Sequence, residues 1–240
     1  MTVTQSDDAP SRASKSRSGG RRVKSRGRRI VVENGLSIVV MSTFLVTWTL
    51  QAVIGMRSYN QDRRDRGVAP VSFGSYLTSG HFIEATGENW ESEFLQMAAF
   101  VWLTSILFQK GSPESNDPDE PDEGTPPVTQ DSPWPARRGG WILKVYENSL
   151  SLTFLLLFLI SFLLHAHGGA IEYSEDQSEY GQPPVTMIQY MATSRFWFES
   201  FQNWQSEFLA IGSMVILGIF LRQKGSPESK SVQTPHWSNE

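Results

Sequence analysis

The sequence predicts an all-α membrane protein of four transmembrane helices. We expect these helices to form two tandem, parallel-repeat helical hairpins with short interfacial helices on the outer face. Three observations lead to this fold class. Two long stretches of the 240-residue chain carry no charged residue, and a shorter apolar run follows each of them. The two halves of the chain repeat one another without a gap. Lys and Arg gather on one side of the expected spans, as they do in membrane proteins.

Two of the apolar segments are long enough to cross a bilayer by themselves. Residues 34–56 form a run of 23 residues without a charge, and residues 148–171 form a run of 24. At about 1.5 Å per helical residue, each exceeds the roughly 30 Å of a hydrocarbon core. The other two segments, 94–109 and 208–221, offer 16 and 14 uncharged residues. Because each follows a long span and ends at the same QKGSPES sequence, we expect both to be transmembrane as well.

An internal duplication covers most of the chain. Residues 31–115 align with residues 145–229 at a constant offset of 114, and 33 of the 85 positions are identical. Shared hydrophobicity does not explain this agreement, because it includes the polar sequences NWxSEFL and QKGSPES. Each unit holds two spans, so both units enter and leave on the same side of the membrane. Such parallel repeats are related by a pseudo-two-fold axis along the membrane normal.

Each unit is expected to fold into a long helix, a short interfacial helix and a second long helix. In the first unit, the first helix should run past the membrane to a glycine cap at Gly67. The aromatic, amphipathic stretch 71–80 predicts the short helix. The second long helix should start near Phe82 and end at Lys110, before a capping Gly111. The positions 114 residues further on predict the same elements in the second unit.

The composition of the connecting segments divides the chain into five parts. We expect a disordered basic cytoplasmic tail at 1–29, a first two-helix repeat at 30–115, an acidic and proline-rich cytoplasmic linker at 116–140, a second two-helix repeat at 141–229 and a disordered tail at 230–240. The linker and tails hold too little apolar surface to form a packed core.

The distribution of Lys and Arg predicts the topology. Sixteen of these residues flank the spans on the side of the termini and the linker, and five lie on the other side. Both termini should therefore be cytoplasmic in a multi-pass protein of the inner, or plasma, membrane. The run SRASKSRSGGRRVKSRGRR also suits nucleic acid. Because this run directly precedes the first span, we interpret it as an orientation signal that contacts anionic lipids, and we expect no nucleic-acid partner.

Several long motifs carry a family resemblance. The sequences ENWESEFLQM and FWFESFQNWQSEFLA, together with RGGWILKVYENSLSL and RQKGSPESK, are similar to those of a family of small bacterial integral membrane proteins, a domain of unknown function. The resemblance covers roughly residues 29–230. It implies a bacterial inner-membrane protein and assigns no substrate, cofactor or catalytic residue.

The NWxSEFL motif places a carboxylate where a hydrocarbon core should begin. Glu93 and Glu207 precede the two shorter apolar runs, and a charged carboxylate within a bilayer is costly. We therefore expect both to face the bundle interior near the pseudo-two-fold axis. Asn89 and Asn203 lie four residues earlier on the same helix faces and can hydrogen-bond to them. These four residues form the candidate polar or ion site of the sequence.

The remaining motifs point to packing rather than to chemistry. Trp90 and Trp204 are expected to be interface anchors, with a cation contact as the alternative. His165 and His167 lie two residues apart, a spacing that turns them to different sides of a helix, so we expect no metal site. The glycines that follow them indicate close helix packing. The chain has no cysteine and none of the GxSxG, Walker, HExxH or dinucleotide-binding motifs.

From these observations we expect a non-enzymatic integral membrane protein of the bacterial inner membrane, without a cofactor. Its partners should be the lipid bilayer and, in a homo-oligomer, further copies of the chain. The alternative is a small channel or transporter that handles cations or protons through Glu93 and Glu207. A membrane enzyme ranks third, because no set of nucleophile, base and metal ligands is evident in the sequence.

Overall fold

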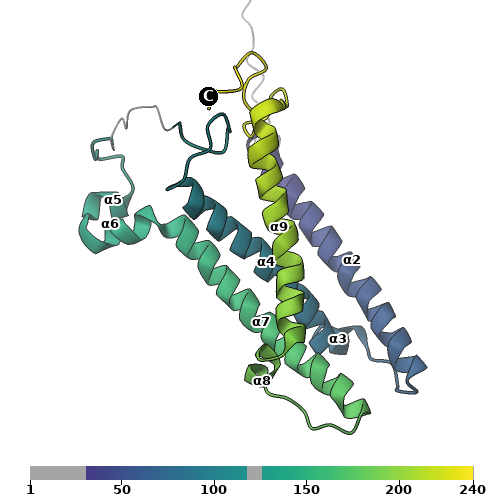
Figure 1. Cartoon of the computed structure of the whole chain (residues 1–240). Coiled ribbons are helices and arrows are strands. Elements are labelled where there is room, and N and C mark those ends of the chain that lie inside the picture. The colour runs from purple at the N-terminus through teal and green to yellow at the C-terminus, as the bar shows by residue number, and fades with distance from the viewer. Residues whose placement is uncertain (1–30, 118–125, 240) are drawn as a thin grey trace, which may run out of the picture. The chain divides into compact units, whose positions relative to one another are not determined.

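Figure 1 shows the computed structural model of the chain, which describes residues 31–117 and 126–239. These residues form helices, turns and irregular segments, and no strand occurs among them. The all-α prediction is therefore confirmed for the described residues. The chain divides into two compact units, residues 1–51 and 52–240, which do not coincide with the two sequence repeats. The predicted disorder of residues 1–29 lies outside the described part of the chain.

The described part of the first unit consists mainly of the N-terminal portion of one helix. Helix α2 spans Gly35–Asp65, and its residues up to Gln51 belong to this unit. The hydroxyls of Thr47 and Thr49 donate to backbone carbonyls one turn earlier, which satisfies them within the helix. The large apolar side chains of this portion are mostly exposed, among them Leu36, Ile38, Val39, Val40, Met41, Leu45, Val46 and Leu50.

Within the described ranges, two helices are long and apolar enough to cross a membrane, namely α2 and α7, which spans Ser149–Glu179. Both continue beyond their apolar segments into polar sequence. They are followed by glycines with positive φ, +73° at Gly67 and +68° at Gly181. The residue after each glycine closes the last turn with a hydrogen bond to the carbonyl five residues earlier. Since only glycine adopts this conformation readily, the two predicted glycine caps are confirmed.

A short helix precedes each of the other two long helices. The short helices are α3 (Phe73–Tyr76) and α8 (Met187–Met191), and the long ones are α4 (Gly80–Thr104) and α9 (Ser194–Phe220). Each of the four begins at a hydroxyl side chain that accepts a backbone N–H of the first turn: Ser72, Thr186, Ser79 and Thr193. The predicted short helices and the starts of the long helices agree with these positions.

The ends of α4 and α9 differ from the prediction. Both helices stop before the QKGSPES motif, and Gly111 and Gly225 lie in later turns with φ of +85° and +84°. The motif forms a turn of its own, because its last serine accepts the backbone N–H of its glutamine. These bonds are 2.7 Å long from Gln109 to Ser115 and 2.8 Å in the second copy. The helices therefore end before the lysine that the sequence suggested as their last turn.

The linker and the C-terminal tail contain more structure than expected. Helix α5 (Trp134–Arg138) lies in the predicted linker, and helix α6 (Gly140–Glu147) follows it at the start of the predicted second repeat. In the predicted disordered tail 230–240, the ammonium group of Lys230 is almost fully buried and donates to four backbone carbonyls, including that of Ser238 at 2.8 Å. Asn239 donates to the carbonyl of Ser115 at 2.8 Å. Hydrogen bonds to backbone carbonyls thus hold a segment whose two large apolar side chains, Val232 and Trp237, are exposed.

The second unit is assembled on a close contact between α4 and α7. A Cβ atom added to Gly87 would lie 2.4 Å from the backbone nitrogen of His165, and one added to Gly168 would lie 2.3 Å from that of Glu84. A Cβ on Gly80 would lie 2.7 Å from the nitrogen of Glu172. The two backbones can approach this closely only because no side chain separates them. The prediction of close packing at the glycines after His167 is confirmed.

Several aromatic contacts recur at the offset of 114 residues. Tyr76 and Tyr190 are both almost completely buried. The ring centroids of Tyr59 and Tyr76 are 5.7 Å apart, as are those of Tyr173 and Tyr190. Each buried tyrosine also lies 5.5 Å from the phenylalanine six residues later. Equivalent residues of the two sequence repeats therefore make equivalent contacts.

Substitution of the glycine contact gives a first prediction. Gly168→Ala should destabilise the protein by about 1–3 kcal/mol, because the new methyl group overlaps backbone atoms that cannot move independently. Gly212→Ala is the matched control: Gly212 is also inside a helix, nothing lies within 4 Å of an added Cβ there, and alanine favours the helix by about 1 kcal/mol. Thermal unfolding in detergent should rank the two variants on opposite sides of the wild type. Equal stability of the two would contradict the close contact.

Candidate functional site

Three glutamates form one stripe along the polar part of α4, ahead of the apolar segment 94–109. Glu84, Glu88 and Glu91 have the i, i+4, i+7 spacing that puts side chains on a single helix face. This face contains the glycines that contact α7. As a result Glu84 is 7% exposed and Glu91 is completely buried. Carboxylates in such surroundings need hydrogen-bond donors or cations.

His165 of α7 is the centre of this polar region. It is completely buried, its Nδ1 lies 2.8 Å from Oε2 of Glu91, and its Nε2 lies 3.5 Å from Oε2 of Glu199 on α9. The ring of Phe196 stacks on the imidazole with a centroid distance of 4.7 Å. Carboxylates from two different helices therefore face the two nitrogens of one fixed imidazole.

Tyr190 of α8 closes the other side of the region. Its hydroxyl lies 3.0 Å from Oε1 of Glu84 and also contacts Oε2 of Glu199. One hydroxyl carries one proton, so it can donate to only one of these carboxylates at a time. The second contact is favourable only when a carboxyl group is itself protonated. The phenol thus marks a place where negative charge exceeds the supply of donors.

Glu91 and Glu199 are held in position by further charged and polar side chains. Arg195 donates from Nε to Glu199 at 2.8 Å and from Nη1 to Asp176 at 2.7 Å. The indole N–H of Trp204 donates to the second oxygen of Glu91 at 2.9 Å. Both oxygens of Glu91 and both of Glu199 are therefore engaged, which fixes these carboxylates in position.

The balance of charge in this region is negative. Four carboxylates lie close together, Glu84, Glu88, Glu91 and Glu199, against one guanidinium and one imidazole. Burial, and secondly the charge of Glu199, raises the pKa of Glu84 to about 7. Burial opposes ionisation of Glu199 too, but hydrogen bonds from His165, Tyr190 and Arg195 lower its pKa overall. The two carboxyl groups that share Tyr190 thus differ in their proton affinity.

The geometry of the cluster suits a metal ion. One ligand atom each from Glu84, His165 and Glu199 can be chosen so that all three lie within 4.8 Å of one another. Nitrogen and oxygen ligands bind at about 2.0–2.2 Å, so two ligands of one ion are at most about 4.4 Å apart. Small side-chain rotations would bring the three atoms into that range. In addition, one oxygen of the nearby Glu172 is buried without a hydrogen-bond donor.

The site residues inferred from the sequence lie elsewhere. Glu93 is exposed on α4, which differs from the prediction that it faces the interior, and Glu207 is half-buried on α9. The reason is helical geometry: Glu93 follows the buried Glu91 by two residues, and that spacing turns it about 200° away. The two carboxylates still lie close enough to interact electrostatically.

The predicted amide partners do not bond to these acids. Asn89 donates to the carbonyl of Ala85 at 2.7 Å, and Asn203 donates to the carboxylate of Glu88. Of the two predicted interface tryptophans, Trp204 bonds to Glu91, and Trp90 is half-buried on α4.

The role of His165 is not evident from its nearest histidine, His167, which points to a different side of the helix. Glutamates on other helices are the relevant partners. The available signal was the i, i+4, i+7 spacing of the three glutamates in a segment already expected to be helical. A comparison of the two repeats does not reveal this signal, because the positions equivalent to Glu84 and His165 are Phe198 and Gln51.

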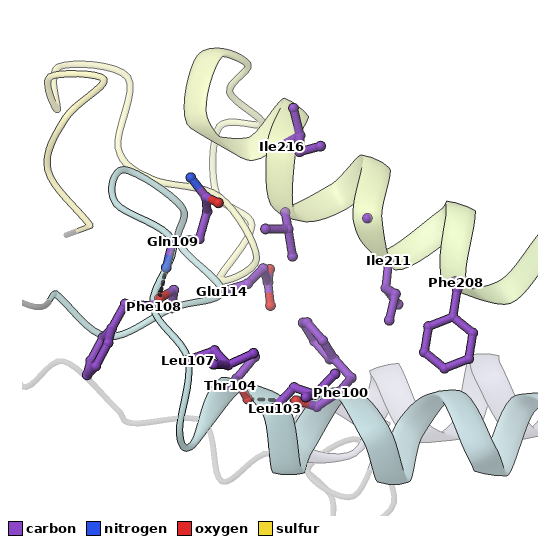
Figure 2. Close-up of a pocket in the computed structure, with 13 residues that line it drawn as sticks. Phe100, Leu103, Thr104, Leu107, Phe108, Gln109, Glu114, Phe208, Ile211 and Ile216 are labelled. Carbon is purple, nitrogen blue, oxygen red and sulfur yellow. Dashed lines mark hydrogen bonds between the residues drawn. The ribbon is translucent and has the colours of Figure 1, made fainter.

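A separate pocket lies between the later parts of α4 and α9 (Figure 2). It has a volume of about 380 Å³ and a mainly apolar lining that includes Phe100, Leu103, Phe208 and Ile211. Glu114 lies beside its polar end. Most of its lining comes from the segments predicted to span the membrane. The carboxylate–histidine cluster, formed by Glu84, Glu88, Glu91, Glu199 and His165, is not part of it.

One comparison with known proteins gives a match. A family model described as "Domain of unknown function (DUF6766)" covers residues 27–240, which is most of the chain. No curated protein and no solved structure matches the chain. The match agrees with the resemblance drawn from the motifs, and it assigns no activity.

The shared phenol gives a second prediction. Tyr190→Phe should cost about 1–3 kcal/mol of stability, because it removes the hydroxyl that lies between the buried Glu84 and the partly buried Glu199. Tyr76→Phe is the control in the other repeat, where the equally buried hydroxyl contacts Nδ1 of His81 at 3.1 Å instead. We expect a smaller loss there, about 1 kcal/mol. Thermal unfolding of both variants measures the difference in stability. An equal loss in the two variants would mean that the contacts of Tyr190 with the carboxylates do not stabilise the protein more than the contact of Tyr76 with His81.

Proposed function

The chain belongs to the DUF6766 family, and from this premise we propose that it is a non-enzymatic integral membrane protein that binds a divalent cation. The cation would lie in the carboxylate–histidine cluster between α4, α7 and α9. One observation carries the proposal: four carboxylates face one imidazole and one guanidinium inside a helical bundle. A bound cation neutralises this excess of charge.

The surface of α7 supports insertion in a membrane. Its apolar side chains are largely exposed, including Leu152, Leu155, Leu156, Leu159, Ile160 and Leu163. A core helix of a soluble protein would bury such side chains, and contiguous exposed apolar surface marks a site of contact with lipid or protein. At about 1.5 Å per residue, the apolar segment 148–171 spans a hydrocarbon core.

We propose four spans arranged as two repeated hairpins. The recurring tyrosine and phenylalanine contacts support two equivalent halves. The segments 94–109 and 208–221 are short for a span. The polar parts of α4 and α9 that precede them would then lie at the outer boundary of the bilayer, together with the cluster. Such a position gives the cluster access to ions from the outer side.

The orientation proposed from Lys and Arg places both termini and the linker in the cytoplasm of a bacterial cell. Anionic lipids of the inner membrane would bind the basic N-terminal segment. The exposed apolar faces also leave room for a homo-oligomer, in which further copies of the chain replace part of the lipid.

Thiol labelling tests this topology, because the chain has no cysteine of its own. We expect a membrane-impermeant maleimide to label Thr78→Cys but not Ser231→Cys in intact spheroplasts, and to label both after lysis. Both positions are exposed in the structure. The reverse pattern in intact spheroplasts would show that the orientation is inverted.

Binding, rather than catalysis, is supported by the closure of the cluster. The side chains of His165 and Glu91 have no exposed surface, so an organic substrate could not contact them in this arrangement of the helices, whereas a single ion is small enough to be enclosed by carboxylates. The side chain of Glu199 is 19% exposed, and we propose that an ion enters past it. Within the cluster, we identify no pair of side chains in which a base activates a neighbouring nucleophile.

The alternative function is the cation- or proton-handling channel or transporter through Glu93 and Glu207. The electrostatic proximity of these two carboxylates is the observation in its favour. In that case the exposed pair, rather than the buried cluster, would govern the response to cations.

One pair of variants separates the two functions. A divalent cation at 100 times its Kd should stabilise the wild-type protein by about 2.7 kcal/mol, measured as the rise in unfolding temperature when Mn²⁺ or Zn²⁺ is added after treatment with a chelator. Glu84→Gln should abolish this rise, and Glu93→Gln, the same change at an exposed position of the same helix, should leave it intact. The opposite outcome would favour the alternative site, and no rise in the wild type would refute cation binding.

A further inference from the structure

We infer that the cluster is a site for one first-row transition-metal ion, held by carboxylate oxygens of Glu84 and Glu199 and by Nε2 of His165. This inference rests on the proposed function and names the class of cation. It also assigns Glu91 as a positioning residue that does not touch the metal. None of these roles follows from the family, whose function is unknown.

The hydrogen bonds of the imidazole select the nitrogen that binds. Nδ1 of His165 lies 2.8 Å from Glu91, at hydrogen-bond distance, whereas Nε2 lies 3.5 Å from Glu199. A neutral histidine that donates from Nδ1 keeps its lone pair on Nε2. Nε2 faces the other two carboxylates, and once it has given up any proton of its own its lone pair points toward them, so this is the nitrogen whose position suits a shared ion.

The arrangement around His165 corresponds to a carboxylate–histidine–metal triad. In such triads a carboxylate accepts the second N–H of the ligating histidine, which fixes the tautomer and the plane of the ring. Glu91 has this place, and its other oxygen is held by the indole of Trp204 at 2.9 Å. Stacking on Phe196 restrains the same ring from its face. A surface ion pair would need neither restraint.

The mixture of ligands identifies the class of metal. Ca²⁺ and Mg²⁺ take oxygen ligands and prefer more of them, or several waters. Imidazole nitrogen together with carboxylate oxygen suits Mn²⁺, Fe²⁺, Co²⁺ or Zn²⁺. With three protein ligands, at least one coordination position remains for water or for the phenol of Tyr190, whose oxygen already contacts both carboxylates.

Cobalt titration tests the inference. The full-length protein is purified in detergent with a histidine-free affinity tag, treated with a chelator and titrated with Co²⁺, whose visible absorption reports its ligands. We expect one equivalent to bind in the wild type, Zn²⁺ to displace it, and Ca²⁺ or Mg²⁺ at the same concentration to leave it bound. Competition in the wild type needs no variant and so does not depend on how any variant folds.

Three variants assign the residues. His165→Gln introduces the residue found at the equivalent position of the first repeat and should abolish the cobalt spectrum. His167→Gln, an exposed histidine two residues away, should leave it unchanged. Glu91→Gln should weaken binding by about tenfold while the shape of the spectrum stays the same, as expected when an outer partner of a ligand is altered. A purely structural role of Glu91 would change the spectrum itself.

The outcomes separate this inference from the proposed function. Equal displacement by Ca²⁺ and Zn²⁺ would overturn the transition-metal site and leave divalent-cation binding in place. Equal loss in the His165 and His167 variants would overturn the assignment of the ligand. No binding of any divalent cation by the wild type would refute both proposals.

Discussion

The approach of α4 to α7 across three glycines is the constraint on which the rest of the second unit depends. Because Gly80, Gly87 and Gly168 place backbone against backbone, the side chains on either side of them lie within the contact instead of around it. Glu84 lies between the two α4 glycines, and His165 lies one turn before Gly168. A wider crossing would leave these groups hydrated. The narrow crossing desolvates them and requires each to find a partner.

The two repeats share the contacts that shape their helices, but they do not share the residues of the cluster. The tyrosines, phenylalanines and capping hydroxyls that shape the helical ends occur in both halves and make matching contacts. The charged residues of the cluster do not: the position equivalent to Glu91 is Gln205, and the position equivalent to Glu199 is Ala85. The cluster combines Glu84 and Glu91 of one half with His165, Tyr190 and Glu199 of the other. It therefore has no counterpart across the proposed pseudo-symmetry axis.

The sequence could predict those features that depend on local chemistry. The lengths of α2 and α7, the glycine caps after them and the short helices ahead of α4 and α9 all follow from periodicity and from residues that have one conformational role. The ends of α4 and α9 could not be predicted, because an uncharged run does not reveal that Ser115 will bond back to Gln109. The cluster could not be predicted because its members lie on four different helices, α4, α7, α8 and α9. Only the distances between helices, set by the glycine contact, bring His165 to within 2.8 Å of Glu91.

The residues of the cluster are distributed unevenly between the two repeats, and this has an evolutionary consequence. In a symmetric dimer of identical hairpins, any substitution appears twice, so a glutamate gained at position 84 would also appear at the place now occupied by Phe198. The dimer would then bury two acidic groups where one is tolerable. Joining the hairpins in one polypeptide removes this linkage and lets each copy mutate independently. Under the proposed duplication, the chain can therefore gather polar groups in a single cluster, whose equivalent positions hold Gln51, Phe198, Ala85 and Gln205.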